Sequence, residues 1–366
     1  MAPRPRPGIL DIEPYVGGRA EIDGRPAVKL SSNENPLGPS PKAVEAYREA
    51  AASLHRYPDG GAGALRAAIG RRFNLDPARI VCGAGSDELI SLLVRAYAGP
   101  GDEVLMSRHG FLMYRIAALA AGCHVVMAPE KELRADVDAL LARVNSRTRI
   151  LFLANPNNPT GSYLTGEELA RLRRELPEDV LLVIDAAYAE YAADAPDYDD
   201  GSTLAATHDN VVMTRTFSKL FGLAALRLGW MYAHPAICDV MHRVRNPFNV
   251  STPAQMAGIA ALADLDHQER SREHNRRWRA WLADAIARLG PKVWPSVANF
   301  LLIEFPREPG RDAAAAEAFL ESEGIIPRRM DPYGLPHTLR VSVGLEEENR
   351  RLVEALARFT GREVRS

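Results

Sequence analysis

The segment ILFLANPNNPTG, residues 150–161, joins two kinds of sequence. Ile150 to Ala154 is an apolar run of the length expected for a strand that is buried on both faces of a sheet. Asn155 to Gly161 consists of residues that favour turns. Composition alone leaves a plain turn and a ligand site equally open. Ligands of open α/β sheets bind just beyond the carboxyl ends of the strands, so the position of this turn favours a ligand site.

The chain alternates short apolar runs with amphipathic stretches from about residue 79 to residue 233. Alternation at this spacing indicates βαβ units. The fold class that we predict is α/β, with a mainly parallel sheet covered by helices on both faces. The predicted strands are 80–81, 103–106, 124–127, 150–154, 180–184, 211–215 and 228–232. The predicted helices are 86–97, which Ser86 or Asp87 caps, 111–121, 136–144 and 165–175.

The pattern changes after residue 250 and predicts a second, smaller α+β domain. Residues 255–289 are predicted to be largely helical, with Trp278 and Trp281 marking an apolar stripe. Strands at 300–304 and near 339–343 and helices at 313–323 and 346–359 follow. We therefore expect an N-terminal arm at residues 1–41 that joins the small domain, a large domain at 42–270 and a small domain at 271–366.

The composition is that of an ordinary soluble globular protein, with 46% hydrophobic and 25% charged residues among 366. It excludes disordered, collagen-like and coiled-coil chains. A net charge of −2 gives no reason to expect nucleic acid or a membrane as a partner. The three cysteines, Cys82, Cys123 and Cys238, lack metal-ligand spacing, so we expect reduced thiols, no metal and a cytoplasmic location.

Further polar residues follow the predicted buried strands. Asp185 ends one strand and Tyr188 lies three residues later. Ser218 and Lys219 follow the next strand, and Arg227 lies eight residues beyond the lysine. A lone aspartate or lysine at such a position has an ordinary structural explanation. Together, at the carboxyl edge of one sheet, these residues favour a shared functional site.

Two more features point to the chemistry of that site. The chain has five lysines, so few can serve a reaction: Lys29, Lys42, Lys131, Lys219 and Lys292. The glycine turn at residues 83–88 leads from a strand into a helix, which is an arrangement that binds phosphate. A lysine for a Schiff base, an aspartate for a pyridine nitrogen and a phosphate cradle are what pyridoxal phosphate requires of a protein.

At this point the sequence resembles fold-type I pyridoxal-phosphate aminotransferases, and among them the histidinol-phosphate aminotransferase family. The resemblance covers nearly the whole chain. It is carried by Ser32-Asn33-Glu34-Asn35-Pro36, Arg56-Tyr57-Pro58-Asp59, the glycine turn, the segment 155–161, Ser218-Lys219 and Arg340-Val341-Ser342-Val343-Gly344.

The resemblance implies a role for each matching residue. Lys219 corresponds to the lysine that forms the internal aldimine, and Asp185 to the partner of the pyridine nitrogen. The other implied cofactor contacts are the stacking ring of Phe111, Asn158 and Tyr188 at the phenolic oxygen, Gly85, Ser86, Asp87, Ser218 and Arg227 at the phosphate, and Tyr57 at the phosphate of a neighbouring subunit. The implied substrate contacts are Arg340 and Asn158 at the α-carboxylate end and Tyr15 and Arg328 at the distal, phosphate-bearing end.

The implied reaction is a ping-pong transamination between histidinol phosphate and 2-oxoglutarate, which yields imidazole acetol phosphate and glutamate in histidine biosynthesis. The implied assembly is a homodimer. His109-Gly110-Phe111 departs from the Pro-Thr-Tyr that is common in the family, and Ala84 stands where asparagine is frequent. Arg329 stands where proline is common, which leaves open whether it or Arg328 meets the substrate phosphate.

Four alternatives remain at the level of sequence. An aromatic amino acid aminotransferase and a phosphothreonine decarboxylase share the fold and the cofactor. A pyridoxal-phosphate-sensing module is disfavoured because no DNA-binding extension is visible in the sequence. A nicotinamide dehydrogenase is disfavoured because the dinucleotide fingerprint is missing from it.

Overall fold

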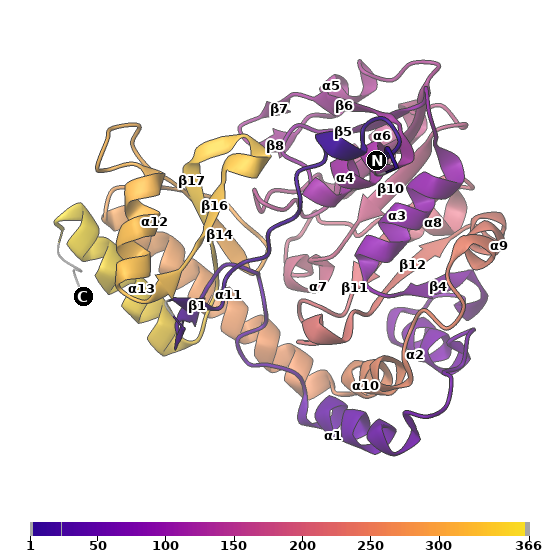
Figure 1. The fold of residues 1–366 in the computed structure, drawn as a ribbon, viewed down its shortest axis with the longest axis horizontal. Helices are drawn as coiled ribbons and strands as arrows, with labels where there is room; N and C mark the ends of the chain where they lie inside the picture. The colour runs from indigo at the N-terminus through magenta and orange to yellow at the C-terminus, as the bar shows by residue number, and fades with distance from the viewer. Residues whose placement is uncertain (1–2, 23, 363–366) are drawn as a thin grey trace.

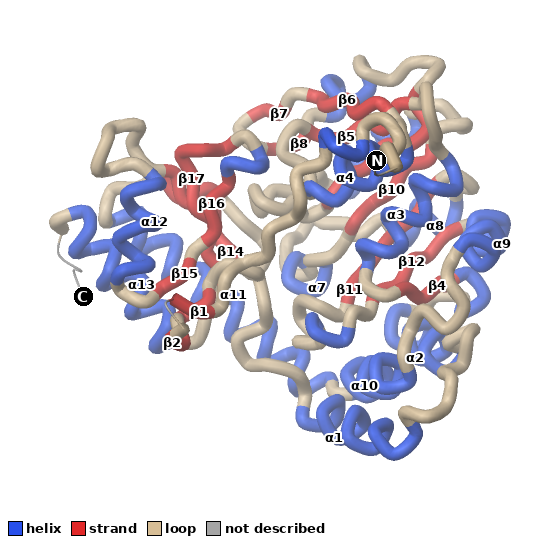
Figure 2. The backbone as a smooth tube through the Cα atoms, in the orientation of Figure 1, coloured by secondary structure: helices blue, strands red, loops and turns tan. Residues whose placement is uncertain are grey.

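A seven-stranded sheet forms the centre of the larger part of the molecule (Figures 1 and 2). The computed structural model describes residues 3–22 and 24–362. The strand order is β4-β12-β11-β10-β9-β5-β6. The bounds are β4 Ile80–Gly83, β5 Glu103–Ser107, β6 His124–Ala128, β9 Thr148–Ala154, β10 Leu181–Asp185, β11 Val211–Thr216 and β12 Gly229–Ala233. Strand β12 runs antiparallel to both of its neighbours and the other pairs are parallel, so the sheet is mainly parallel as predicted.

Two apolar cores cover the two faces of this sheet, because alternate side chains of each strand point to opposite sides. In β9, Leu151 and Leu153 enter one core, and Ile150 and Phe152 enter the other. The first core includes side chains of α1 Pro41–Ala50, α2 Gly63–Phe73, α5 Val137–Leu141, α6 Gly166–Glu175, α8 Ser202–Thr207 and α10 Thr252–Ala263. The second includes side chains of α3 Ser86–Tyr97, α4 Leu112–Ala121 and α9 Pro235–Val244.

A smaller antiparallel sheet lies beside the large one, with strand order β13-β14-β17-β16 (Figure 1). Its strands are β13 Lys292–Trp294, β14 Phe300–Glu304, β16 Arg328–Met330 and β17 Leu335–Ser342. Its core packs against α11 Leu265–Arg288, α12 Ala313–Ser322 and α13 Glu346–Thr360. Helix α11 extends from the large sheet's side of the molecule into this part (Figure 1), so the boundary at residue 270 stays a prediction.

The N-terminal segment passes between the two parts of the molecule (Figure 1). It holds the 3-10 turn η1 Ile9–Asp11 and the short strands β1 Glu21–Ile22, β2 Arg25–Pro26 and β3 Val28–Lys29. Strand β3 pairs in parallel with β15 Ile325–Ile326 of the smaller part, and Leu30 enters its core. The segment is thus part of the small unit's packing, and the arm predicted as extended contains these short strands.

Several predicted boundaries need correction. Helix α3 begins at Ser86 with Gly85 in the N-cap position, so neither Ser86 nor Asp87 is the cap. Gly85 has a φ of 85°, which glycine adopts without strain. Helix α5 ends at Leu141, short of the predicted residue 144. No helix within the described residues combines the length and the apolar character that crossing a membrane requires.

Candidate active site

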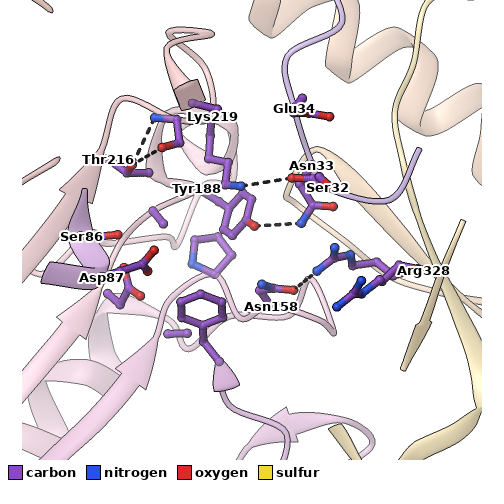
Figure 3. A pocket seen from close by; sticks show the side chains of 18 of the residues that line it. Ser32, Asn33, Glu34, Ser86, Asp87, Asn158, Tyr188, Thr216, Lys219 and Arg328 are labelled. Carbon is purple, nitrogen blue, oxygen red and sulfur yellow. Dashed lines mark hydrogen bonds between the residues drawn. The ribbon is translucent and has the colours of Figure 1, made fainter. Parts of the chain in front are cut away.

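The carboxyl ends of the large sheet's strands, the segment 31–34 and strands β16 and β17 of the small sheet enclose a cavity of about 240 Å³ (Figure 3). Most of the residues predicted from the sequence line it: Tyr15, Ser86, Asp87, Phe111, Asn158, Asp185, Tyr188, Ser218, Lys219, Arg227, Arg328 and Arg340. Gly85 directly precedes Ser86 and contacts Arg227. Tyr57 lies outside this cavity and is 82% exposed.

Lys219 lies in the loop after β11, and its side chain points toward the segment 31–34 (Figure 3). Its Nζ donates a hydrogen bond to the carbonyl oxygen of Ser32 at 3.4 Å. The same atom lies 5.6 Å from the centre of the Tyr188 ring. The lysine amine is therefore held at the cavity by one weak hydrogen bond and by its contact with the Tyr188 ring. Among the described residues, no carboxylate pairs with it. A ligand can displace these contacts at small cost.

Asp185 ends β10 at the base of the cavity and is almost completely buried. Tyr114 Oη donates to its Oδ2 at 2.7 Å, and Thr214 Oγ1 donates to its Oδ1 at 3.0 Å. Burial raises the pKa of this carboxyl to about 6, although both hydrogen bonds act in the opposite direction. The described residues provide no cation within ion-pair distance of it, so a positively charged ligand group would relieve the cost of burying its charge.

An anion site lies at the start of α3. Gly85 approaches Arg227 so closely that a Cβ there would lie 2.6 Å from Nη2 of the arginine. Arg227 Nη1 donates to Ser218 Oγ at 3.3 Å, and its Nη2 donates to Asp87 Oδ2 at 3.1 Å. The first N–H groups of α3, which begins at Ser86, have no partner within the helix. A helix N-terminus, a hydroxyl and a guanidinium together suit a phosphate group.

Tyr188 and Asn158 lie on the opposite side of the cavity from Ser86 and Asp87 (Figure 3). Tyr188 Oη accepts a hydrogen bond from Asn33 Nδ2 at 2.9 Å. Asn158 Oδ1 accepts from Arg340 Nη1. Arg340 also donates from Nη2 to the carbonyl oxygen of Ser31 at 2.7 Å. The segment 31–33 is thus bonded to groups from both parts of the molecule.

The two arginines Arg328 and Arg340 lie directly opposite each other on paired strands β16 and β17. Arg340 is 6% exposed, and its buried Nε has no hydrogen-bond partner among the described residues. Arg328 lies at the mouth, where its Nη2 donates to the carbonyl oxygen of Val16 at 2.6 Å and its guanidinium faces the Tyr15 ring. A ligand that bears a carboxylate or a phosphate can satisfy both cations.

The structure separates Arg328 from its neighbour Arg329, because adjacent strand residues point to opposite faces. Arg328 lines the cavity. Arg329 forms ion pairs with Asp331 at 2.7 Å and with Glu317 at 3.7 Å. The sequence left open which arginine meets the substrate phosphate, and only Arg328 of the two faces the cavity.

Sequence reasoning assigned no role to three residues that shape the site. Asn33 bonds Tyr188, Tyr114 bonds Asp185, and Tyr333 lines the cavity from the 3-10 turn η5 Asp331–Tyr333. Asn33 belongs to one of the motifs on which the resemblance rests, so that motif could have indicated a role for it in the site. Tyr114 lies three residues after Phe111, on a helix whose apolar pattern concealed its polar contact.

Residues 25–356 match the family described as Aminotransferase class I and II. The chain belongs to this aminotransferase family. The aminotransferase assignment made from the sequence motifs is therefore confirmed, and the dehydrogenase alternative is excluded.

The chain is similar to two histidinol-phosphate aminotransferases over nearly its whole length. It is 58% identical over 361 residues to that of Paramagnetospirillum magneticum, which covers 98% of this chain and 99% of the relative. It is 59% identical over 355 residues to that of Rhodospirillum centenum, covering 97% and 98%. The crystal structure of the Sinorhizobium meliloti enzyme in complex with pyridoxal-5'-phosphate has a TM-score of 0.89 and 30% identity and covers 98% of each chain. The predicted fold class is confirmed.

The residues around the cavity fit pyridoxal phosphate. Asp185 presents a buried carboxyl without a cation, which suits a protonated ring nitrogen. The anion site at Gly85 and Arg227 suits the phosphate, and the amine of Lys219 lies in the same cavity to meet the aldehyde. The separate roles of these residues stay predictions that the geometry supports.

The raised pKa of Asp185 predicts a pH dependence for the cofactor-free chain. Since the pKa of about 6 in the folded chain exceeds the ordinary aspartate pKa of 3.8, the stability that this carboxyl contributes is fully present below about pH 4 and is lost as the pH rises through 6. Asp185→Asn should therefore raise the free energy of unfolding at pH 8 by roughly 3 kcal/mol and change it little at pH 4. Urea unfolding of the two cofactor-free proteins at both pH values measures this.

The control for this experiment is Glu178→Gln, which changes an exposed carboxylate that precedes β10, the strand whose other end is Asp185. It should leave the difference between pH 4 and pH 8 as it is in the unsubstituted chain. An Asp185→Asn protein that is no more stable than the parent at pH 8 would contradict a costly burial of the Asp185 charge.

Proposed function

We propose that this chain transfers the amino group between histidinol phosphate and 2-oxoglutarate, with pyridoxal phosphate as the cofactor, in histidine biosynthesis. The main support for the proposal is the set of residues that line the cavity. It gathers Lys219, Asp185, the anion site at Arg227 and the facing pair Arg328 and Arg340, in a chain that is similar over nearly its full length to histidinol-phosphate aminotransferases.

The protein's part in the reaction follows from four side chains. Bound pyridoxal phosphate supplies a ring that accepts the electron pair when the C–H bond at the substrate's amine-bearing carbon breaks. The Asp185 carboxylate keeps positive charge on the ring nitrogen, and Tyr188 and Asn158 lie where they can donate hydrogen bonds from the other side. The Lys219 Nζ would take the proton from the substrate's amine-bearing carbon and deliver it to the cofactor carbon that carries the nitrogen, and in the second half of the cycle it would move a proton in the reverse direction.

The pair of arginines explains how one cavity serves both substrates of a ping-pong reaction. In glutamate the α-carboxylate is attached to the carbon that bears the amine, and in histidinol phosphate a CH2–O–phosphate group takes that place. The phosphate therefore belongs to the α-carboxylate end of the substrate and not to the distal end, where the resemblance had placed it. Arg340 can hold two oxygens of either anion with its fork of donors. A phosphate dianion has a third oxygen and a second charge, which Arg328 at the mouth can meet.

A substrate panel separates this reaction from the remaining alternatives. We expect the highest kcat/KM with histidinol phosphate and 2-oxoglutarate, a lower value with phenylalanine, and no carbon dioxide from phosphothreonine. The experiment is a steady-state assay of glutamate formation, with carbon dioxide release measured in parallel. Lys219→Ala serves as the blank, because without its amine the proton has no carrier. A preference for phenylalanine, or decarboxylation of phosphothreonine, would replace the proposed function with the corresponding alternative.

Arg328 should discriminate between the two substrates. We expect Arg328→Gln to lower kcat/KM for histidinol phosphate by about 10- to 100-fold, the cost of losing a hydrogen bond between charged groups. The loss for glutamate should be smaller, because Arg340 alone can satisfy a carboxylate. Arg329→Gln is the matched control, since Arg329 pairs with Glu317 and Asp331 outside the cavity, and it should change either value less than twofold. Equal losses for the two substrates would contradict a phosphate contact by Arg328.

We also propose that the chain works as a homodimer in the cytoplasm. Large apolar side chains are exposed on α1 and in the segments near it: Tyr47, Leu54, Tyr57 and Phe248. Tyr57 remains mostly exposed, but it stacks on Phe248 with ring centres 4.6 Å apart, and this contact orders its ring. Such a group of apolar residues suits a surface that a second copy covers. The cytoplasmic location is supported by three cysteines that are buried and unpaired.

A charge placed on this surface should separate the subunits. We expect the parent chain, of 40.1 kDa, to sediment at twice its mass and Leu54→Glu to sediment as a single chain, because a carboxylate cannot be buried there without a partner. Sedimentation equilibrium measures both. Leu10→Glu, which changes another exposed leucine, is the control and should leave the mass of the parent unchanged. A parent protein of single-chain mass would overturn the proposed dimer.

A further inference from the structure

Tyr114 is a completely buried tyrosine whose hydroxyl reaches Asp185, a residue of the cavity lining. It lies on α4, and its Oη donates to Asp185 Oδ2 at 2.7 Å. The other oxygen of Asp185 accepts from Thr214 on the neighbouring strand β11. The two donors approach the carboxylate from different elements, so each constrains a different oxygen. With its oxygens bonded in this way, the carboxyl still faces the cavity, which Asp185 helps to line.

Two aromatic rings hold the ring of Tyr114 in place. It stacks on Phe152 with ring centres 4.6 Å apart and planes inclined by only 6°. Phe111, which lines the cavity, meets it edge to face at 5.8 Å. Both arrangements are favoured geometries for aromatic pairs. A ring fixed in this way has little freedom to turn its hydroxyl away from Asp185.

Filling the space does not require the hydroxyl. The apolar core around Tyr114 includes Val104, Ala117 and Ala118, which a phenylalanine ring would contact equally well. The hydroxyl instead provides a neutral donor to a buried carboxylate. A neutral donor stabilises the negative charge of Asp185 without competing as a cation for the place of a positively charged ligand group.

We propose that Tyr114 is a positioning residue that holds Asp185 charged and oriented toward the ring nitrogen of the cofactor. The inference rests on the proposed function, since it concerns how the same cavity binds pyridoxal phosphate. Tyr114 touches neither substrate nor cofactor in this role and acts only through Asp185. Tyr114 also links two residues that are expected to contact the cofactor ring, because its own ring packs on Phe111 and its hydroxyl donates to Asp185.

The test compares two ligands in two proteins. The ligands are pyridoxal phosphate and its analogue in which a carbon replaces the ring nitrogen. The proteins are the parent chain and Tyr114→Phe, each prepared free of cofactor, and equilibrium dialysis gives the dissociation constants. The parent should prefer pyridoxal phosphate over the carbon analogue. Tyr114→Phe should reduce this preference about tenfold, because the lost hydrogen bond served the charge that meets the nitrogen.

Tyr163→Phe is the matched control. Tyr163 Oη also donates to a carboxylate, Asp197 Oδ1 at 2.6 Å, but on the surface. This variant should keep the parent's preference for pyridoxal phosphate. If Tyr114→Phe does not fold, 3-fluorotyrosine at position 114 keeps the hydroxyl and makes it a stronger donor, and the preference should then increase.

The outcomes distinguish this inference from the proposed function. If Tyr114→Phe weakens both ligands equally, or 3-fluorotyrosine leaves the preference unchanged, Tyr114 only fills space and the inference is overturned. If the parent chain itself fails to bind pyridoxal phosphate or does not prefer it to the carbon analogue, the proposed function fails first. A loss of preference in Tyr114→Phe alone supports the role of Tyr114.

Discussion

A carboxyl group buried without a cation, Asp185, is the constraint on which the arrangement of the site depends. Its position at the end of β10, in the interior of the seven-stranded sheet, removes it from water and raises its pKa. Tyr114 and Thr214 offset part of that cost through hydrogen bonds. The part of the cost that these hydrogen bonds do not offset favours the binding of a positively charged group in the cavity. Binding of a cofactor with a positively charged ring nitrogen relieves the cost of burying the Asp185 charge. Such a cofactor is therefore bound more tightly than it would be in a cavity whose carboxylate already had a cation as its partner.

The segment 31–35 has the complementary role of joining the two parts of the molecule around the cavity. Asn33 donates to Ser342 Oγ through its backbone and to Tyr188 through its side chain, while its carbonyl accepts from Asn299. Asn35 bonds the carbonyl of Leu220 and the hydroxyl of Ser271. Because these contacts reach both parts, a shift of one part relative to the other would also displace Tyr188 and the carbonyl that holds Lys219. The N-terminal segment is thus a component of the site and not an appendage.

Much of the fold was predictable because its strands are apolar runs separated by capped helices, a pattern that local sequence carries. Thr165 caps α6 with the reciprocal Glu168 contact expected of a capping box. The antiparallel direction of β12 was not predictable, because an apolar run is the same in either direction. The short strand β3 was missed, since its pairing with β15 depends on a partner about 300 residues away.

The sequence by itself determined the family and which residue types gather at the sheet edge, since the motifs and the strand ends lie along the chain. It could not decide between Arg328 and Arg329, because one position along a strand reverses the face, and only the pairing of β16 with β17 fixes which side meets the cavity. Nor could it assign Tyr114 to Asp185, which lie 71 positions apart. Hydrogen bonds between distant elements depend on how helices pack on the sheet, and that packing is a property of the tertiary structure alone.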